Sequence, residues 1–148
     1  MSMRFSVKGN SLWRVAIDRS NIGDASESIT FDVERGAVVR LAEAIGDEQP
    51  SYAEGAAAPP TFPTTFNFRL PVPSLRAIDP SRFIHGDQEY VYERPLRAGD
   101  RITCVAKIAD VNEKETRLGT ATFVVVETEG RDQADELVFT GRATVILR

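Results

Sequence analysis

The chain has 148 residues, of which 42% are hydrophobic, and a formal net charge of −4 at pH 7. That length suits one domain with a hydrophobic core of its own. The mildly acidic charge and the lack of an arginine-rich run exclude the usual signature of a nucleic-acid binder, so we expect no nucleic-acid partner.

Membrane insertion and secretion have no signal in the sequence. No apolar run approaches the roughly 20 residues that a bilayer-spanning helix needs. The first residues, MSMRFSVKGNSLW, lack the apolar segment of a signal peptide. Cys104 is the only cysteine, which excludes a disulfide framework within the chain. We therefore expect a cytoplasmic protein with no membrane partner.

The single histidine, His85, restricts the chemistry further. Zinc sites built from several His or Cys ligands cannot form within one chain. The sequence has no G-x-S-x-G nucleophile elbow and no glycine-rich phosphate loop of either common kind. We expect neither a metal nor a bound cofactor.

The amino-terminal part is polar and weakly patterned. Trp13, Val15 and Ile17 alternate with other residues, and this alternation predicts either a short edge strand or an extended arm over the surface. We assign residues 1–26 to this arm or edge strand. Residues 27–148 are predicted to form a single domain.

A strand and a helix open that domain. Residues 27–33 alternate in polarity, with Asp32 as the expected N-cap of the following helix. Apolar residues spaced at i, i+3, i+4 and i+7 from Val38 to Ile45 predict an amphipathic helix. Gly46 supplies the residue that most often ends a helix in the left-handed conformation.

A second helix and four long strands follow. Pro59 and Pro60 precede an apolar stretch from Thr61 to about Phe68, which predicts a largely buried helix with prolines at its entry. Alternating polarity then predicts four strands joined by polar hairpins. The predicted strands are residues 83–94, 102–111, 118–127 and 137–147.

Helices that are segregated from an antiparallel sheet make an α+β fold. The order of strand, helix, buried helix and four strands is that of the hot-dog fold, in which a curved antiparallel sheet is wrapped around a central helix. On this interpretation the late strands bury Phe62, Phe66 and Phe123 together.

Three segments resemble one family: AEAIGDEQPSY at 42–52, APPTFP at 58–63 and HGDQEYVYERPLRAGD at 85–100. They look like the N-terminal MaoC-type dehydratase domain, and are similar to R-specific enoyl-thioester hydratases and to paired dehydratase subunits of fatty-acid and steroid pathways. The resemblance covers roughly Ile29 to Arg148. It implies a hot-dog fold, a homodimer or heterodimer with a second hot-dog subunit, and an acyl-CoA or acyl-carrier thioester as ligand.

The catalytic motif of that family is incomplete here. Active members resemble G-D-x-N-P-x-H, where the aspartate and histidine orient the water that adds to the double bond or leaves from it. Gly46, Asp47 and Pro50 match, whereas Gln49 replaces the asparagine and Tyr52 replaces the histidine. A tyrosine hydroxyl, with a reference pKa of about 10, is a poor general base at neutral pH.

A second motif also departs from the pattern. Active members resemble A-H-G at the start of the central helix, where a backbone N–H polarises the thioester carbonyl. Pro59 and Pro60 occupy the equivalent positions and have no N–H to donate. Thr61 would supply one if the alignment shifts by a residue.

The resemblance implies two sets of site residues. Asp47 is a candidate catalytic residue, and His85 could replace the missing base from the strand side. The expected substrate-binding residues, which would line the acyl pocket, are Tyr52, Pro59, Pro60, Thr61 and Phe62. Each has a structural alternative, because Asp47 can cap a turn and the others can simply pack. Tyr90 and Tyr92 are expected at a subunit interface.

The resulting functional hypothesis is a subunit of a MaoC-like hydratase or dehydratase acting on enoyl- or 3-hydroxyacyl thioesters. This chain would be the non-catalytic half, which shapes the acyl pocket while a partner supplies the aspartate and histidine. The alternatives are a catalytic homodimer that uses Asp47 and His85, a hot-dog thioesterase, and a binding module for acyl groups, because a fold alone does not fix a function.

Overall fold

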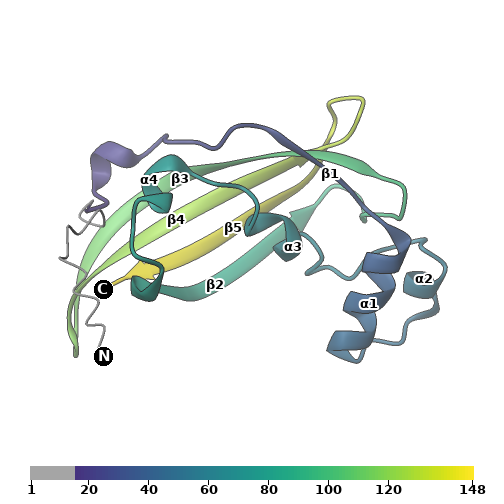
Figure 1. Cartoon of the computed structure of the whole chain (residues 1–148), viewed down its shortest axis with the longest axis horizontal. Coiled ribbons are helices and arrows are strands. Elements are labelled where there is room, and N and C mark those ends of the chain that lie inside the picture. Colours follow the sequence, from purple (N-terminus) through teal and green to yellow (C-terminus); the bar gives the residue numbers. More distant parts are fainter. Residues whose placement is uncertain (1–15) are drawn as a thin grey trace, which may run out of the picture.

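The computed structural model describes residues 16–148 (Figure 1). It contains one five-stranded antiparallel sheet with the spatial order β1-β3-β4-β5-β2. The strands are β1 (Ile29–Asp32), β2 (Phe83–Tyr92), β3 (Arg101–Thr116), β4 (Gly119–Arg131) and β5 (Leu137–Leu147). The α-helices are α1 (Arg35–Ile45), α2 (Pro50–Ala53), α3 (Thr64–Asn67) and α4 (Pro73–Arg76).

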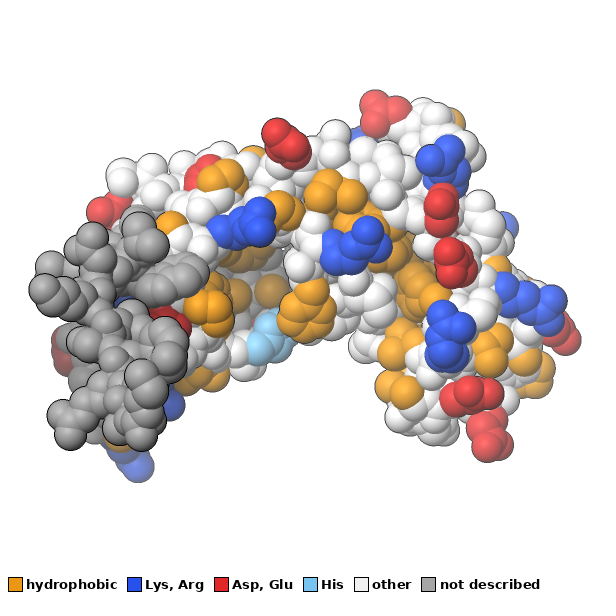
Figure 2. Space-filling model, in the orientation of Figure 1, with side chains coloured by type: hydrophobic (Ala, Val, Ile, Leu, Met, Phe, Trp, Pro, Cys, Tyr) orange, Lys and Arg blue, Asp and Glu red, His pale blue; other side chains and the backbone are white. Residues whose placement is uncertain are grey.

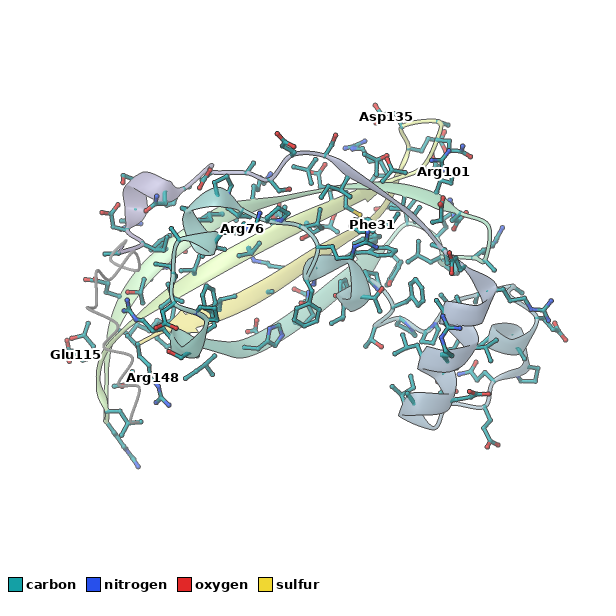
Figure 3. The ribbon with its side chains drawn as sticks, viewed as in Figure 1. Phe31, Arg76, Arg101, Glu115, Asp135 and Arg148 are labelled. Atoms are coloured by element: carbon teal, nitrogen blue, oxygen red, sulfur yellow. The ribbon has the colours of Figure 1, made fainter. Side chains whose placement is uncertain are left out.

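The helices occupy two places relative to the curved sheet. Figure 1 shows α3 and α4 against one face, which we call the concave face, and α1 and α2 beyond one end of the sheet. Glu115 and Arg148 lie at the opposite end (Figure 3). This arrangement confirms the predicted α+β hot-dog fold.

The long strands carry the alternation that the sequence predicts. Ile102, Cys104, Ala106 and Ile108 are all buried. A register shift between Ile108 and Asp110 then adds one residue, so burial on β3 continues at Val111. The predicted hairpin tip at 112–116 is wrong, because β3 and β4 remain paired as far as Thr116 and Gly119.

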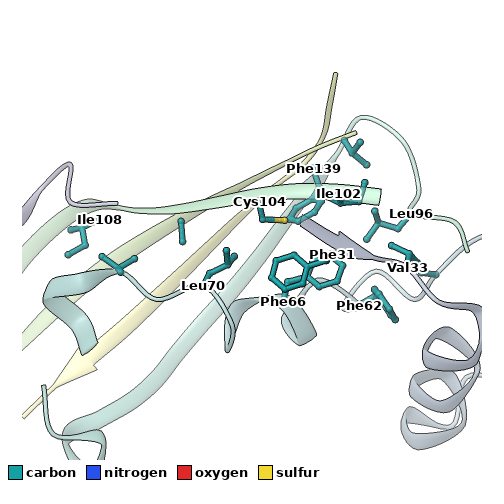
Figure 4. Packing of buried hydrophobic residues seen from close by; sticks show 14 of the residues in the cluster. Phe31, Val33, Phe62, Phe66, Leu70, Leu96, Ile102, Cys104, Ile108 and Phe139 are labelled. Carbon is teal, nitrogen blue, oxygen red and sulfur yellow. The ribbon is translucent and has the colours of Figure 1, made fainter. Parts of the chain in front are cut away.

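Phe123 does not join the core as predicted. Its neighbour Val124 is fully buried, so Phe123 points to the opposite, convex face of β4, where the Lys114 ammonium lies 4.7 Å from the ring centroid. The core partner is Phe31 of β1 instead. Its ring stacks on Phe66 with centroids 4.5 Å apart, and Phe62 meets Phe66 edge-on at 5.7 Å (Figure 4).

The central helix is shorter than the predicted stretch of 61–68. Only α3 is helical, a single turn of four residues. Proline has no N–H for helical bonding, and Pro63 directly precedes this turn. Phe66 on α3 is buried as expected, whereas Phe68, at the C-terminal end of the turn, is 90% exposed.

Helix α1 ends as predicted but begins later. Gly46 has φ 71° and its N–H donates to the carbonyls of Ala42 and Glu43. The N-cap is Glu34 rather than Asp32. Asp32 still belongs to β1, where its carboxylate forms an ion pair with Arg101, with Oδ1 3.0 Å from Nε.

The described part of the amino-terminal arm runs along β3. The N–H of Gly23 donates to the carbonyl of Ile108, and that of Ser26 to Ala106, each at 2.8 Å. The arm also contains the short 3-10 helix η1 (Arg19–Asn21), and Ile17 is buried. Trp13 and Val15 lie outside the described residues, and the domain boundary at residue 26 stays a prediction.

Aromatic rings on the concave face rest on two glycines. The ring of Phe139 lies against Gly130 of β4, and the ring of Tyr90 lies against Gly141 of β5. Tyr90 and Tyr92 also pack on Phe139, with ring centroids 6.1 and 5.9 Å from it. A side chain at either glycine would displace a ring.

We therefore expect Gly130→Ala to lower the free energy of unfolding by about 1–3 kcal/mol, because the new methyl group overlaps the Phe139 ring. Gly36→Ala is a matched control in α1, where the new Cβ meets only the flexible end of Arg40 at 3.1 Å. It should be neutral or stabilise by about 0.5 kcal/mol. Urea denaturation of the three proteins measures both, and equal effects would contradict this account of Gly130.

Candidate functional site

The turn between α1 and α2 forms a pocket of about 450 Å³. Gly46 ends α1 in the left-handed conformation, and Pro50 starts α2, so the chain reverses over four residues between them. The N–H of Asp47 donates to the carbonyl of Ala42 at 2.9 Å, which fixes the start of this turn. The pocket is lined by Val39, Ala42, Glu43, Gly46, Asp47, Glu48, Gln49, Tyr52 and Ala53.

Asp47 and Tyr52 meet in this pocket. Tyr52 is only 6% exposed. Burial raises the pKa of its hydroxyl, and the negative charge of Asp47 and a hydrogen bond with it act in the same direction. The phenol is therefore protonated at neutral pH, so the residue that the resemblance aligns with the family's histidine is not a base there.

The segment after α2 is anchored to the loop between β2 and β3. Gly55 has φ +74°, and a Cβ there would lie 2.8 Å from that of Ala98. The N–H of Ala98 donates to Gly55 at 3.1 Å, and that of Ala58 donates to Leu96 at 2.7 Å. Arg35 closes the other side of the unit, donating from Nη2 to the carbonyl of Ala53 at 2.7 Å.

The predicted substrate-binding residues 59–62 form one turn next to this anchor. Pro59 and Phe62 are buried in the core, whereas Pro60 and Thr61 are exposed. None of the four lines the α1–α2 pocket, so the structure separates them from Tyr52. Their role in binding stays a prediction.

Tyr90 and Tyr92 hold this turn and α3 in place. The Tyr92 hydroxyl donates to the carbonyl of Pro60 at 2.7 Å. The Tyr90 hydroxyl lies 2.9 Å from Thr64 Oγ1 and accepts from Asn67 Nδ2 at 3.2 Å. The sequence reasoning missed this role, because tyrosines two apart on a strand show a shared face but not what lies above it.

His85 lies away from Asp47. It is exposed on β2 opposite Val145, beside the bulge between His85 and Asp87. Figure 2 shows the histidine at the rim of an apolar hollow in the middle of the molecule, apart from the α1–α2 unit. One chain therefore does not bring the two candidate catalytic residues together.

Other chemistry has little support in the described part of the chain. Residues 16–148 contain no group of three or more His, Cys, Asp and Glu side chains arranged to hold a metal ion. Burial raises the pKa of the Cys104 thiol to about 12, which makes it a packing residue. No helix in this region has the length and apolar character needed to span a bilayer.

The three tyrosines predict a fall in stability at high pH. Burial is the first cause that raises each of their pKa values above the ordinary value of 10. Below about pH 10 the tyrosines are protonated in both states, and their contribution to stability is fully present. Unfolded tyrosines ionise at a lower pH than folded ones, so this contribution is lost as the pH rises through the tyrosine pKa values of the folded state.

Denaturant unfolding between about pH 8 and pH 11 should show this loss, and native tyrosine absorbance should titrate above about pH 10. Tyr92→Phe keeps the ring and should make the loss shallower. Native tyrosines that titrate at the ordinary value would contradict the prediction.

Known proteins agree with this architecture. The family model described as "FAS1-like, dehydratase domain region" matches residues 20–141. A UPF0336 protein of Streptomyces griseus is 32% identical over 149 residues, covering 90% of this chain and 97% of its own length.

Two solved structures are similar as well. The C-terminally truncated HadBC complex, a 3R-hydroxyacyl-ACP dehydratase of Mycobacterium tuberculosis, aligns with a TM-score of 0.72 and 25% identity over 85% of this chain and 96% of that one. A MaoC-like dehydratase aligns with a TM-score of 0.75 and 20% identity over 86% of this chain and 42% of that longer one. These two structures share the fold, and the family model that matches residues 20–141 establishes that the chain belongs to the MaoC-like hot-dog dehydratases, in their FAS1-like dehydratase region.

Proposed function

We propose that this chain is the non-catalytic half of a hydratase or dehydratase that acts on enoyl- or 3-hydroxyacyl thioesters. The observation that carries the proposal is the pairing of Tyr52 with Asp47. Tyr52 is buried beside Asp47 in one pocket, and its raised pKa keeps it protonated at neutral pH. The lining of the pocket includes no histidine to share with Asp47 the activation of a water molecule, so a partner chain would supply the aspartate and histidine.

The charge of the pocket also argues against binding the thioester there. Glu43, Asp47 and Glu48 line it, and its lining includes no Lys or Arg. The phosphates of CoA or of a carrier's prosthetic arm would be repelled by such a site. The pocket thus suits a positioning role better than a binding role.

The concave face near β2 suits an acyl chain better. Leu75, Phe83 and Val145 are only partly buried there, and α3 is a single turn. Figure 2 shows the apolar hollow on this side, with the histidine at its rim. Apolar, concave surfaces of this kind favour acyl groups. We propose that this chain contributes this surface to the acyl pocket, with Pro60 and Thr61 at its edge.

The partner in this proposal is a second hot-dog chain. This protein aligns with 96% of one chain of HadBC. HadBC is a complex and a 3R-hydroxyacyl-ACP dehydratase. Its likeness supports a paired assembly and an acyl thioester as the substrate class. We further propose the cytoplasm as the compartment, because a lone buried cysteine suits a reducing environment.

Activity measurements test the division of labour. The purified chain alone should not hydrate crotonyl-CoA. Co-expressed with a MaoC-like chain from the same genome that keeps G-D-x-N-P-x-H, it should form an active complex. Activity should survive Asp47→Asn in this chain and be lost when the partner's motif aspartate is changed. Hydration by this chain alone that disappears with Asp47→Asn would refute the proposal.

A catalytic homodimer is the second candidate, favoured by the exposure of His85 at the rim of the hollow. Since Asp47 lies elsewhere in the same chain, His85 would have to act on the partner's substrate. His85→Ala should then cost about 10²–10⁴-fold in rate. Under our proposal it changes the activity of the complex by less than about threefold. Release of free CoA with the double bond intact would instead indicate a thioesterase.

A further inference from the structure

A second pocket lies at the end of the sheet away from α1 and α2, where β3 turns into β4. Figure 3 shows Glu115 and Arg148 at this end. The pocket has a volume of about 270 Å³, and we call it the convex pocket. Its lining comes from four strands and the β3–β4 turn: Ile84, Thr116, Arg117, Leu118, Ala121, Phe123, Ile146 and Arg148.

The floor of the convex pocket is a row of apolar side chains from three strands. Ile146 of β5 is paired with Ile84 of β2 and with Phe123 of β4. Directly paired residues point to the same face of a sheet, so this row lies on the convex face with Phe123. All three side chains are only partly buried. Helices α3 and α4 lie against the other face (Figure 1), so neither covers the row.

The β3–β4 turn forms one wall of the pocket and is fixed by hydrogen bonds. Thr116 Oγ1 donates to the carbonyl of Gly119 at 2.7 Å and accepts from the N–H of Leu118 at 3.2 Å. Gly119 has φ +105°, which glycine adopts without steric cost. The turn leaves Leu118 80% exposed beside the apolar floor. A ligand on this floor would remove apolar surface from water.

The charged groups at the rim of the pocket are cationic. Arg117 and Arg148 line it, and its lining includes no Asp or Glu. Among residues 16–148 neither guanidinium forms an ion pair. Lys114 adds a third positive charge, because its ammonium lies 4.7 Å from the centroid of the Phe123 ring in the floor.

The carboxylates of the same hairpin lie on the other face. Glu113 and Glu115 alternate with Lys114 along β3, and successive side chains of a strand point to opposite faces. Arg82 adds a further cation near the pocket, with its Nε donating to the main-chain oxygen of Arg148 at 3.1 Å. The convex pocket therefore combines an apolar floor with a positively charged rim.

We propose that the convex pocket binds an aliphatic carboxylate of medium chain length, with the chain on the apolar floor and the carboxylate between Arg117 and Arg148. A guanidinium binds a carboxylate through two parallel N–H···O bonds, which fixes the orientation of the acid. The volume lies just below the usual range of about 300–1,000 Å³ for ligand pockets, so it suits a small acid rather than a complete acyl thioester. The site is across the sheet from the proposed acyl surface and goes beyond the proposed function.

A titration of the full chain with sodium octanoate, followed by NMR of isotope-labelled methyl groups, tests the proposal. The methyl resonances of Ile84 and Ile146 should shift together with a dissociation constant of about 1 mM or lower. Those of Ile22 and Ile45, which are exposed elsewhere, should not shift. Each methylene added between butanoate and octanoate should tighten binding about two- to fourfold. Octylammonium has the same chain and the opposite charge, and should bind at least about tenfold more weakly.

Two variants separate the contributions of the rim and the wall. Arg117→Gln removes a guanidinium and should weaken octanoate binding about three- to tenfold, as should Leu118→Ser, which removes apolar surface. Both residues are exposed at a turn, so both variants should fold. Arg40→Gln is the matched control, because it makes the same change on an exposed residue of α1. It should leave binding unchanged, and added salt should weaken binding to the wild type.

Each contrary result has a distinct meaning. Shifts of Leu75 and Val145 without Ile84 and Ile146 would place octanoate on the proposed acyl surface and overturn this proposal while supporting the proposed function. Equal binding of octylammonium, equal weakening by Arg40→Gln, or shifts that do not saturate would show unspecific association and overturn it. Shifts of Ile84 and Ile146 with protein concentration alone would assign the pocket to a second copy and overturn it too. None of these measurements depends on turnover of a thioester.

Discussion

The fold depends on contacts between the sheet and a central helical segment that is too short to be stable on its own. Helix α3 has four residues, and an isolated turn of that length is not stable in water. The stacking of Phe31 on Phe66 fixes it from β1, and the Tyr90 hydroxyl fixes it from β2, while the Tyr92 hydroxyl binds the preceding turn at Pro60. Because these contacts come from opposite edges of the sheet, the curvature of the sheet and the position of α3 determine each other.

The candidate site residues lie in two separate parts of the fold. Asp47 and Tyr52 belong to the α1–α2 unit at one end of the sheet, whereas His85 lies on β2 and the turn at 60–63 is bonded to Tyr92 of β2. Tyr52 is buried beside Asp47 in the pocket, and its raised pKa keeps its hydroxyl protonated at neutral pH. The α1–α2 unit thus places a buried, protonated tyrosine beside Asp47 and no histidine.

Much of the fold follows from the sequence because alternation along the strands and the left-handed residue Gly46 are local signals. The length of the central helix was overestimated, since Phe62 and Phe66 mark a buried face without showing how much of the segment is helical. Phe123 was placed on the wrong face because both faces of β4 carry apolar residues. The alternating charges that face one another across neighbouring strands, at Lys107, Glu127, Arg142 and Glu89, could not be predicted, because they depend on register between strands far apart in the chain.

The bonds between residues 55–58 and 96–98 have a consequence for how such a chain can diverge. A residue gained or lost between Pro95 and Asp100 would shift the acceptors of Ala58 and the contact of Gly55 together, and would detach the α1–α2 unit. The turns at 117–118 and 132–136 bear no comparable tie to that unit among the described residues. We therefore expect related chains to vary in length at the hairpin tips and to keep a constant length in the connection between β2 and β3.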